Sequence, residues 1–154
     1  MSRKREQGVK LWQRRAGGKT GFAQLYYDLL DSDAFHDLTA RQKMLYVYSV
    51  RESHGRAAAE NGADERLFYM NKALRSERHH LYATSDKRGF ERDMAALIEH
   101  GLVDCVISGY KNRERNLYRL SARWHNWGSP SFSMPDDVLT THMRLQRAKD
   151  TESI

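Results

Sequence analysis

The sequence predicts an α+β fold built around one amphipathic helix that runs directly into a β-hairpin. Apolar residues at helical spacing mark one face of this helix: Phe90, Met94, Leu97 and Ile98. After Gly101 the pattern changes to a continuous apolar run rich in β-branched residues, 102–107, which is typical of a strand. A second strand, 117–120, is expected to return after a polar loop. The rest of the chain is organised around this stretch.

Both ends of the helix carry termination signals. The Ser85 side chain can accept hydrogen bonds from the free N–H groups of a first turn. Gly101 can adopt the left-handed conformation that ends many helices. We therefore expect the helix to span residues 85–100.

The loop between the two strands, 110–116 (YKNRERN), is strongly basic. Lys111, Arg113 and Arg115 surround a single glutamate at the expected tip of the hairpin. Cations so close together repel one another, so their clustering favours contact with phosphates. Tyr110 either packs on a sugar or closes the hairpin.

A lead-in segment and a first core helix precede this stretch. Residues 22–35 are rich in apolar side chains and are expected to pack on the core. Thr39 and Gln42 match the reciprocal capping box of a helix N-terminus. The helix is expected to continue through 41–54 with an apolar stripe made of Met44, Leu45, Val47 and Tyr48.

Shorter elements connect the first core helix to the central stretch. Residues 56–64 are small and polar, which indicates an exposed loop, and 67–70 are apolar, which indicates a strand. Asn71 is a suitable N-cap for a short helix, 72–78, and residues 79–83 are expected to form a turn.

The predicted order is therefore helix, strand, helix, helix, strand, strand, with a basic loop between the last two strands. This order defines a winged helix-turn-helix. We assign the domain to 22–128, a flexible basic arm to 1–21 and a C-terminal tail to 129–154. The tail contains one short helical pattern after Pro135, which either docks on its own domain, joins a homodimer or stays disordered. Its apolar face would be made of Val138, Leu139 and Met143.

The charge distribution indicates a polyanionic partner. The first 21 residues hold seven Lys and Arg side chains against one acidic residue, so the arm accounts for the whole net charge of +6. The helix–hairpin half carries a further positive excess, which acidic residues nearer the N-terminus balance.

Composition also predicts where the protein works. The sequence contains no apolar run long enough to span a membrane, and no apolar segment follows the basic N-terminus as in a secretory signal. Cys105 is the single cysteine of the chain and gives no disulfide framework. We therefore expect a cytoplasmic protein that does not enter the membrane.

Several stretches resemble winged-helix proteins of conjugative plasmids and integrative elements, especially those of Gram-positive bacteria. The resembling stretches are the lead-in ending in Leu38-Thr39, LFYMN, RDMAALIEHGLVD and NLYRLSARWHNWG. The family includes N-terminal domains of replication initiators and accessory proteins of the transfer-origin complex. The resemblance implies an accessory or regulatory DNA binder that acts in transfer, replication or transcription, beside other proteins of such a complex. The sequence lacks the His-hydrophobic-His site of nicking enzymes.

The predicted helix offers residues for both kinds of DNA contact. If its apolar face points inward, Arg88 and Arg92 point outward one turn apart, and either can bond guanine in a major groove. Lys87, Gly89 and the free N–H groups of the helix start, next to Ser85, suit phosphate contacts. We also expect Ala95 and Ala96 to lie beside this outward face. The basic arm is expected to contact phosphates or an adjacent minor groove through Arg3, Lys4, Arg5, Arg14 and Arg15.

Alternatives to this interpretation remain open. Arg88 and Arg92 also fit an ordinary solvated face, because acidic residues lie nearby. A winged helix can instead bind or inhibit a protein, or it can bind RNA. Trp12, Trp124 and Trp127 could contact a partner, although Trp124 more commonly closes a core.

The sequence offers no constellation for catalysis, a metal or a cofactor. His79 and His80 point in different directions on any regular element, and no second cysteine completes a zinc site. Cys105 is more typical of a small core residue than of a nucleophile. We therefore expect a binding protein rather than an enzyme.

Overall fold

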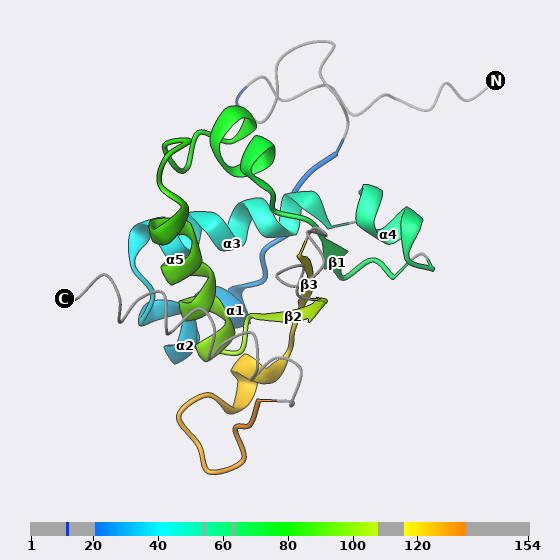
Figure 1. The fold of residues 1–154 in the computed structure, drawn as a ribbon. Helices are drawn as coiled ribbons and strands as arrows, with labels where there is room; N and C mark the ends of the chain where they lie inside the picture. The colour runs from blue at the N-terminus through cyan, green and yellow to red at the C-terminus, as the bar shows by residue number, and fades with distance from the viewer. Residues whose placement is uncertain (1–11, 13–20, 54, 63, 108–115, 135–154) are drawn as a thin grey trace.

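The computed structural model describes residues 12, 21–53, 55–62, 64–107 and 116–134 of the 154-residue chain (Figure 1). Helices surround a small three-stranded antiparallel sheet, so the predicted α+β class is confirmed. None of the helices in these ranges combines the length and the apolar composition needed to cross a lipid bilayer.

The lead-in segment forms two short helices, α1 (Tyr27–Leu30) and α2 (Asp33–His36). The hydroxyl of Ser32 accepts a hydrogen bond from the Phe35 N–H and thereby caps α2. Leu29 and Phe35 reach the core, as predicted for this segment, but several of its aromatic side chains remain in solvent. The lead-in therefore packs through one side only.

Helix α3 (Ala40–Glu52) begins with the predicted capping box. The N–H of Gln42 donates to Thr39 Oγ1 at 3.3 Å, and the N–H of Thr39 donates to Gln42 Oε1 at 2.9 Å. The predicted apolar stripe was partly wrong. Leu45 is buried as predicted, but the other buried residues of the helix are Tyr46 and Ser49. Met44 lies one helical step away from Leu45 and is 44% exposed.

The loop predicted at 56–64 was wrong in part, because it contains a short helix, α4 (Arg56–Glu60). Ala57 and Ala58 are buried, and Ala57 packs in a small cluster with Leu67 and Leu117. The sequence of this segment resembles that of an exposed loop, but its small side chains pack beside the sheet.

The sheet has the order β1-β3-β2, so the last strand lies in the centre. Strand β1 (Leu67–Phe68) is shorter than predicted, whereas β2 (Val103–Ile107) and β3 (Leu117–Leu120) agree closely with the sequence. Both neighbours pair antiparallel with β3, and a register shift interrupts the β2–β3 ladder between Cys105 and Ile107. Cys105 is buried, as expected of a small core residue.

Two helices lie between β1 and β2. The first, η1 (Ala73–Arg78), is a π-helix whose first turn is closed by the Asn71 side chain, which accepts from the Leu74 N–H at 3.0 Å. The second, α5 (Lys87–Glu99), ends before Gly101, whose φ of +78° confirms the predicted left-handed stop. A short 3₁₀-helix, η2 (Arg123–Asn126), follows β3.

The main core lies between α3, α5 and the sheet. It buries all four apolar residues that defined the central helix in the sequence: Phe90, Met94, Leu97 and Ile98. Trp124 packs partly against this core, and so does Met134, six positions beyond the expected domain boundary at Gly128. The helical pattern after Pro135 lies outside the described residues.

Candidate nucleic-acid interface

The start of α5 is capped by Asp86 and not by Ser85. The Asp86 carboxylate accepts a hydrogen bond from the Gly89 N–H at 2.9 Å, and Ser85 lies exposed just before the helix. The prediction of Ser85 as the cap was therefore wrong by one residue. The carboxylate also places negative charge at the N-terminus of the helix, where a phosphate was expected to bind free N–H groups.

Gly89 is buried, and its role follows from the cap. A Cβ at this position would lie 2.6 Å from Asp86 Oδ1 and 2.8 Å from Asp86 Cγ, which is too close. The structure thus explains Gly89 by the space that Asp86 needs. The Gly89 N–H, which was predicted to suit a phosphate, donates to Asp86.

Three cationic side chains of α5 reach solvent, as predicted. Lys87, Arg88 and Arg92 are exposed, and Lys87 Nζ lies 3.9 Å from the Glu91 carboxylate one turn later. Ala95, however, is buried, so its expected place beside the outward face was wrong. The exposed edge of α5 therefore runs from Lys87 to Arg92.

A buried carboxylate fixes α5 against α3. Asp93 accepts hydrogen bonds from Arg41 Nε at 2.8 Å, Gln42 Nε2 at 3.3 Å and the Tyr82 hydroxyl at 2.7 Å. Burial, together with the Asp93 carboxylate, raises the pKa of Tyr82 well above its usual value. This network sets the orientation at which α5 presents its exposed edge.

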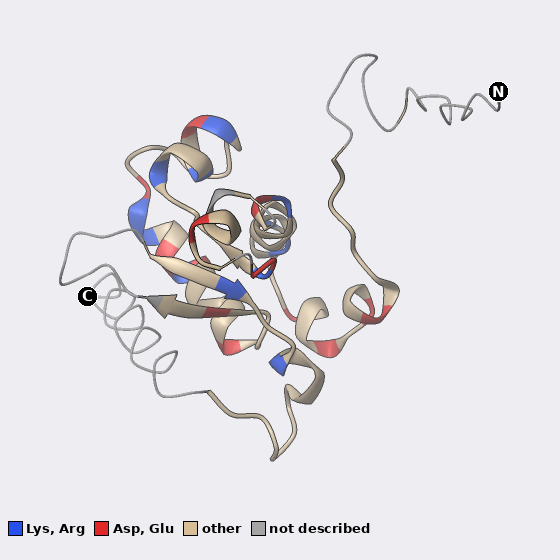
Figure 2. Cartoon of the chain, turned by 90° about the vertical axis from the view of Figure 1, so that its right-hand side faces the viewer, with Lys and Arg blue, Asp and Glu red and all other residues tan. Residues whose placement is uncertain are grey.

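Helix η1 brings further cations to the same side of the molecule. Arg78 and the preceding N-cap residue Lys72 are exposed, whereas Arg75 is half-buried with its guanidinium 4.1 Å from the centre of the Phe90 ring. Figure 2 shows Lys and Arg residues on η1 and at the start of α5, and acidic residues on the α1–α2 segment. Sequence reasoning missed the η1 cations, because nothing in 72–78 reveals that its side chains reach the first turn of α5.

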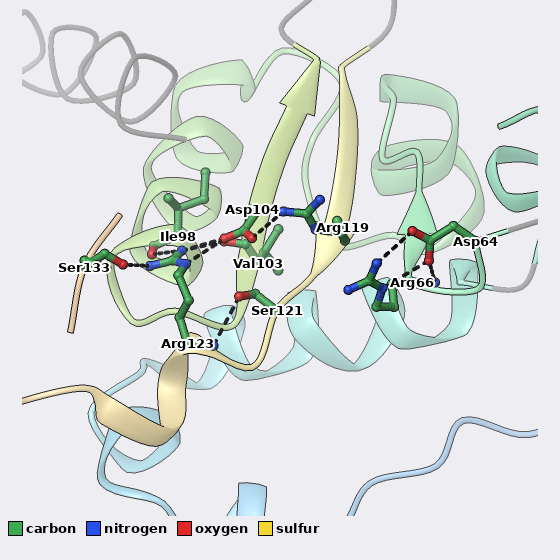
Figure 3. Close-up of polar contacts among 9 residues, drawn as sticks. All are labelled: Asp64, Arg66, Ile98, Val103, Asp104, Arg119, Ser121, Arg123 and Ser133. Atoms are coloured by element: carbon green, nitrogen blue, oxygen red, sulfur yellow. Dashed lines mark hydrogen bonds and ion pairs between the residues drawn. The ribbon is translucent and has the colours of Figure 1, made fainter. Parts of the chain in front are cut away.

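At the base of the hairpin, Asp104 binds two arginines (Figure 3). Arg119 Nη2 donates to Asp104 Oδ2 at 3.0 Å, and Arg123 Nε donates to Asp104 Oδ1 at 2.8 Å. Arg123 also donates to the backbone oxygens of Ile98 and Val103. Asp104 therefore compensates the charges of Arg119 and Arg123.

A second acid–arginine pair lies beside β1. Arg66 donates to both carboxylate oxygens of Asp64, at 3.1 and 3.0 Å (Figure 3). These hydrogen bonds lower the pKa of the Asp64 carboxyl. The Arg66 charge is therefore matched locally.

The remaining predicted contacts lie outside the described residues. They are the loop residues Tyr110, Lys111, Arg113 and Arg115 and the arm residues Arg3, Lys4, Arg5, Arg14 and Arg15. Trp12, which the structure describes within the arm, is 80% exposed.

Histidine and tryptophan side chains make contacts within the chain. His79 is buried against Glu52, with 2.8 Å between Nε2 and Oε1, whereas His80 is exposed, so the two point in different directions as expected. Trp127 stacks on His100 with ring centres 4.8 Å apart, and Trp124 stacks on His125.

Among the described residues, no group of three His, Cys, Asp or Glu side chains is arranged to hold a metal ion. Comparison of the chain with family models, with curated proteins and with solved structures found no match.

Proposed function

We propose that this chain is a winged-helix protein that binds duplex DNA, with α5 in the major groove and the basic 110–116 loop, called the wing below, on phosphates. Its resemblance to winged-helix proteins of conjugative plasmids and integrative elements favours an accessory or regulatory role on such an element, without enzymatic activity. The arm would contact the backbone beside the wing.

The observation that carries the proposal is the exposed cationic edge of α5 on a rigid support. Lys87, Arg88 and Arg92 reach solvent from one helix, and the buried Asp93 network holds this helix in place. Arginine presents a planar fork that fits the O6 and N7 acceptors of guanine, and a good pair contributes about 1–3 kcal/mol of discrimination.

Sheet topology supports the same proposal. The order β1-β3-β2 makes β2 and β3 a hairpin whose connection is the basic loop, and α5 leads directly into this hairpin. The acidic α1–α2 segment lies away from η1 and the start of α5 (Figure 2). A polyanion would therefore be attracted to one side of the molecule and repelled from the other.

Charge reversal in the wing tests the proposal. The double variant Arg113→Glu, Arg115→Glu should bind a mixed-sequence duplex much more weakly than the native chain. The log–log slope of affinity against salt should fall by about 0.9 for each phosphate that the variant no longer binds. Binding is measured by fluorescence anisotropy between about 0.05 and 0.2 M salt.

The matched control carries the same change of charge elsewhere. Lys43 lies over the Phe35 ring near α2, and Arg66 pairs with Asp64, so Lys43→Glu, Arg66→Glu alters net charge equally but away from the proposed interface. Its affinity and slope should stay closer to the native values. Unchanged affinity in the wing variant would remove the wing from the interface. Equal affinity for a hairpin RNA would instead indicate an RNA binder.

A second candidate function, recognition of a protein partner, is favoured by a different observation. Large apolar side chains near the N-terminus of the domain remain in solvent, and Phe22 and Met44 line a cavity of about 430 Å³. The exposed residues are Phe22, Tyr26, Tyr27 and Met44. Exposed apolar patches commonly mark protein interaction sites. A native chain that binds no duplex at low salt would support this second function.

A further inference from the structure

Arg75 is held in a fixed position at a junction of three elements. It lies on η1, its guanidinium covers the Phe90 ring in the first turn of α5, and Nη1 donates to the Met70 backbone oxygen at 3.4 Å. Tyr118 on β3 lies near enough to influence the pKa of the guanidinium. The side chain thus lies where η1, α5 and the hairpin meet.

Other arginines that pack against the described domain each have a carboxylate partner. Arg41 pairs with Asp93, and Arg119 and Arg123 pair with Asp104. Arg75 differs, because no carboxylate of the described residues lies within ion-pair distance of it. Glu91 attracts it more weakly, and burial, the larger effect, lowers the pKa of the Arg75 guanidinium.

An uncompensated, partly desolvated cation is costly unless an anion neutralises it. In the described part of the chain, the Nε and Nη2 groups of Arg75 donate to no protein atom, so donors remain for a ligand. Stacking on Phe90 restricts the guanidinium plane before any ligand binds, which reduces the entropy cost of binding. Lys87 and Arg88 follow on the adjoining turn of α5 and add positive potential.

A hairpin residue connects this junction with the wing. Asn116, the first described residue after the wing tip, donates from Nδ2 to the Tyr118 hydroxyl at 3.1 Å. Tyr118 stacks on Phe68 in the sheet, so its position is fixed. Arg75 therefore lies against the first turn of α5, on the side of the sheet where Tyr118 binds Asn116.

We propose that Arg75 binds a DNA backbone phosphate next to the segment read by α5. This inference rests on the proposed function and adds a contact on η1 that the sequence does not indicate. The planar guanidinium suits the two free oxygens of a phosphodiester, which it can bind in a bidentate manner.

Two substitutions at Arg75 test the inference against a purely structural role. Arg75→Gln removes the charge, so the slope of log affinity against log salt should fall by about 0.9, and affinity should fall about tenfold. Arg75→Lys keeps the charge but loses the planar fork, so its slope should stay native while affinity falls less. The probe is the same mixed-sequence duplex, with Arg66→Gln as the matched control.

The slope separates binding from folding. Partial unfolding of a variant lowers apparent affinity by a similar factor at each salt concentration and leaves the slope unchanged. A native slope in Arg75→Gln, or an equal loss of slope in Arg66→Gln, would overturn the phosphate contact while leaving DNA binding intact. Failure of the native chain to bind duplex would instead overturn the proposed function, and this inference with it.

Discussion

At the scale of single residues, Asp86 and Gly89 depend on each other. The Asp86 carboxylate closes the first turn of α5, and it occupies the space that a side chain on Gly89 would need. Glycine costs a helix about 1 kcal/mol relative to alanine, and an N-cap contributes a similar amount. The two effects are thus of comparable size and opposite sign.

We predict a coupling between substitutions at these two positions. Gly89→Ala in the native chain should gain little stability or lose some, because the added methyl displaces the cap. In an Asp86→Ala background the same substitution should stabilise the protein by about 1 kcal/mol. Urea unfolding of the native chain, the two single variants and the double variant measures the interaction energy, and additive effects would show that the cap and the glycine are independent.

Single side chains also show what sequence can predict. The capping box of Thr39 and Gln42 and the left-handed Gly101 were correct, because each depends on residues within a few positions. By contrast, nothing in the sequence indicated that the buried Asp93 binds Arg41, 52 positions away. A local pattern cannot reveal a partner that only tertiary packing brings near.

At the scale of elements, α5 packs on the core with one face and exposes cations on the other. Its apolar face closes the core, and its exposed edge carries Arg88 and Arg92 one turn apart. Cations on such an edge can read bases or hold phosphates, and these roles have different consequences.

We predict that Arg88 and Arg92 read bases. Alanine substitution of either residue should relax sequence preference at one position of a selected site by about 1–3 kcal/mol, with a smaller effect on random duplex. Selection from a randomised duplex library followed by competition binding makes the comparison. Equal loss on all sequences would assign the substituted arginine to the phosphate backbone.

Elements with a regular apolar pattern were predictable, whereas elements that depend on tertiary packing were not. Helix α5 and strand β3 match the sequence closely, because each has a regular apolar pattern. Helix α4 was missed, since its alanines resemble a loop until the sheet covers them. The π-helical form of η1 was not predicted either. Its hydrogen bonds join residues five apart, such as the His79 N–H and the Leu74 oxygen, and the sequence of this segment fits an ordinary α-helix equally well.

At the scale of the whole molecule, buried titratable groups link stability to pH. Burial lowers the pKa of His79, and the hydrogen bond with Glu52 opposes this shift only in part. His79 also stacks on Tyr48 with ring centres 4.3 Å apart. Folding therefore favours the neutral imidazole, and the unfolded chain takes up a proton more readily than the folded one.

We predict that this group destabilises the protein in acid. Its contribution is intact above the unfolded pKa of about 6.5 and is lost as pH falls toward the lower folded value. The melting temperature of the native chain should therefore fall more steeply between about pH 7 and 5 than that of His79→Gln. His36→Gln, which alters an exposed histidine, should keep the native pH profile, and parallel profiles for all three would contradict the assignment.

The two arginines bound by Asp104 join segments that are distant in the sequence. Arg123 contacts the Ile98 oxygen across 25 positions and Asp104 across 19, so these bonds form only after α5, β2 and β3 have assembled. Interactions made late in folding contribute little to the speed of assembly, but they must break before the chain opens. We therefore expect the Asp104 cluster to slow the release of the hairpin from the end of α5, so that Asp104→Asn should unfold faster in stopped-flow measurements while its folding rate stays close to native.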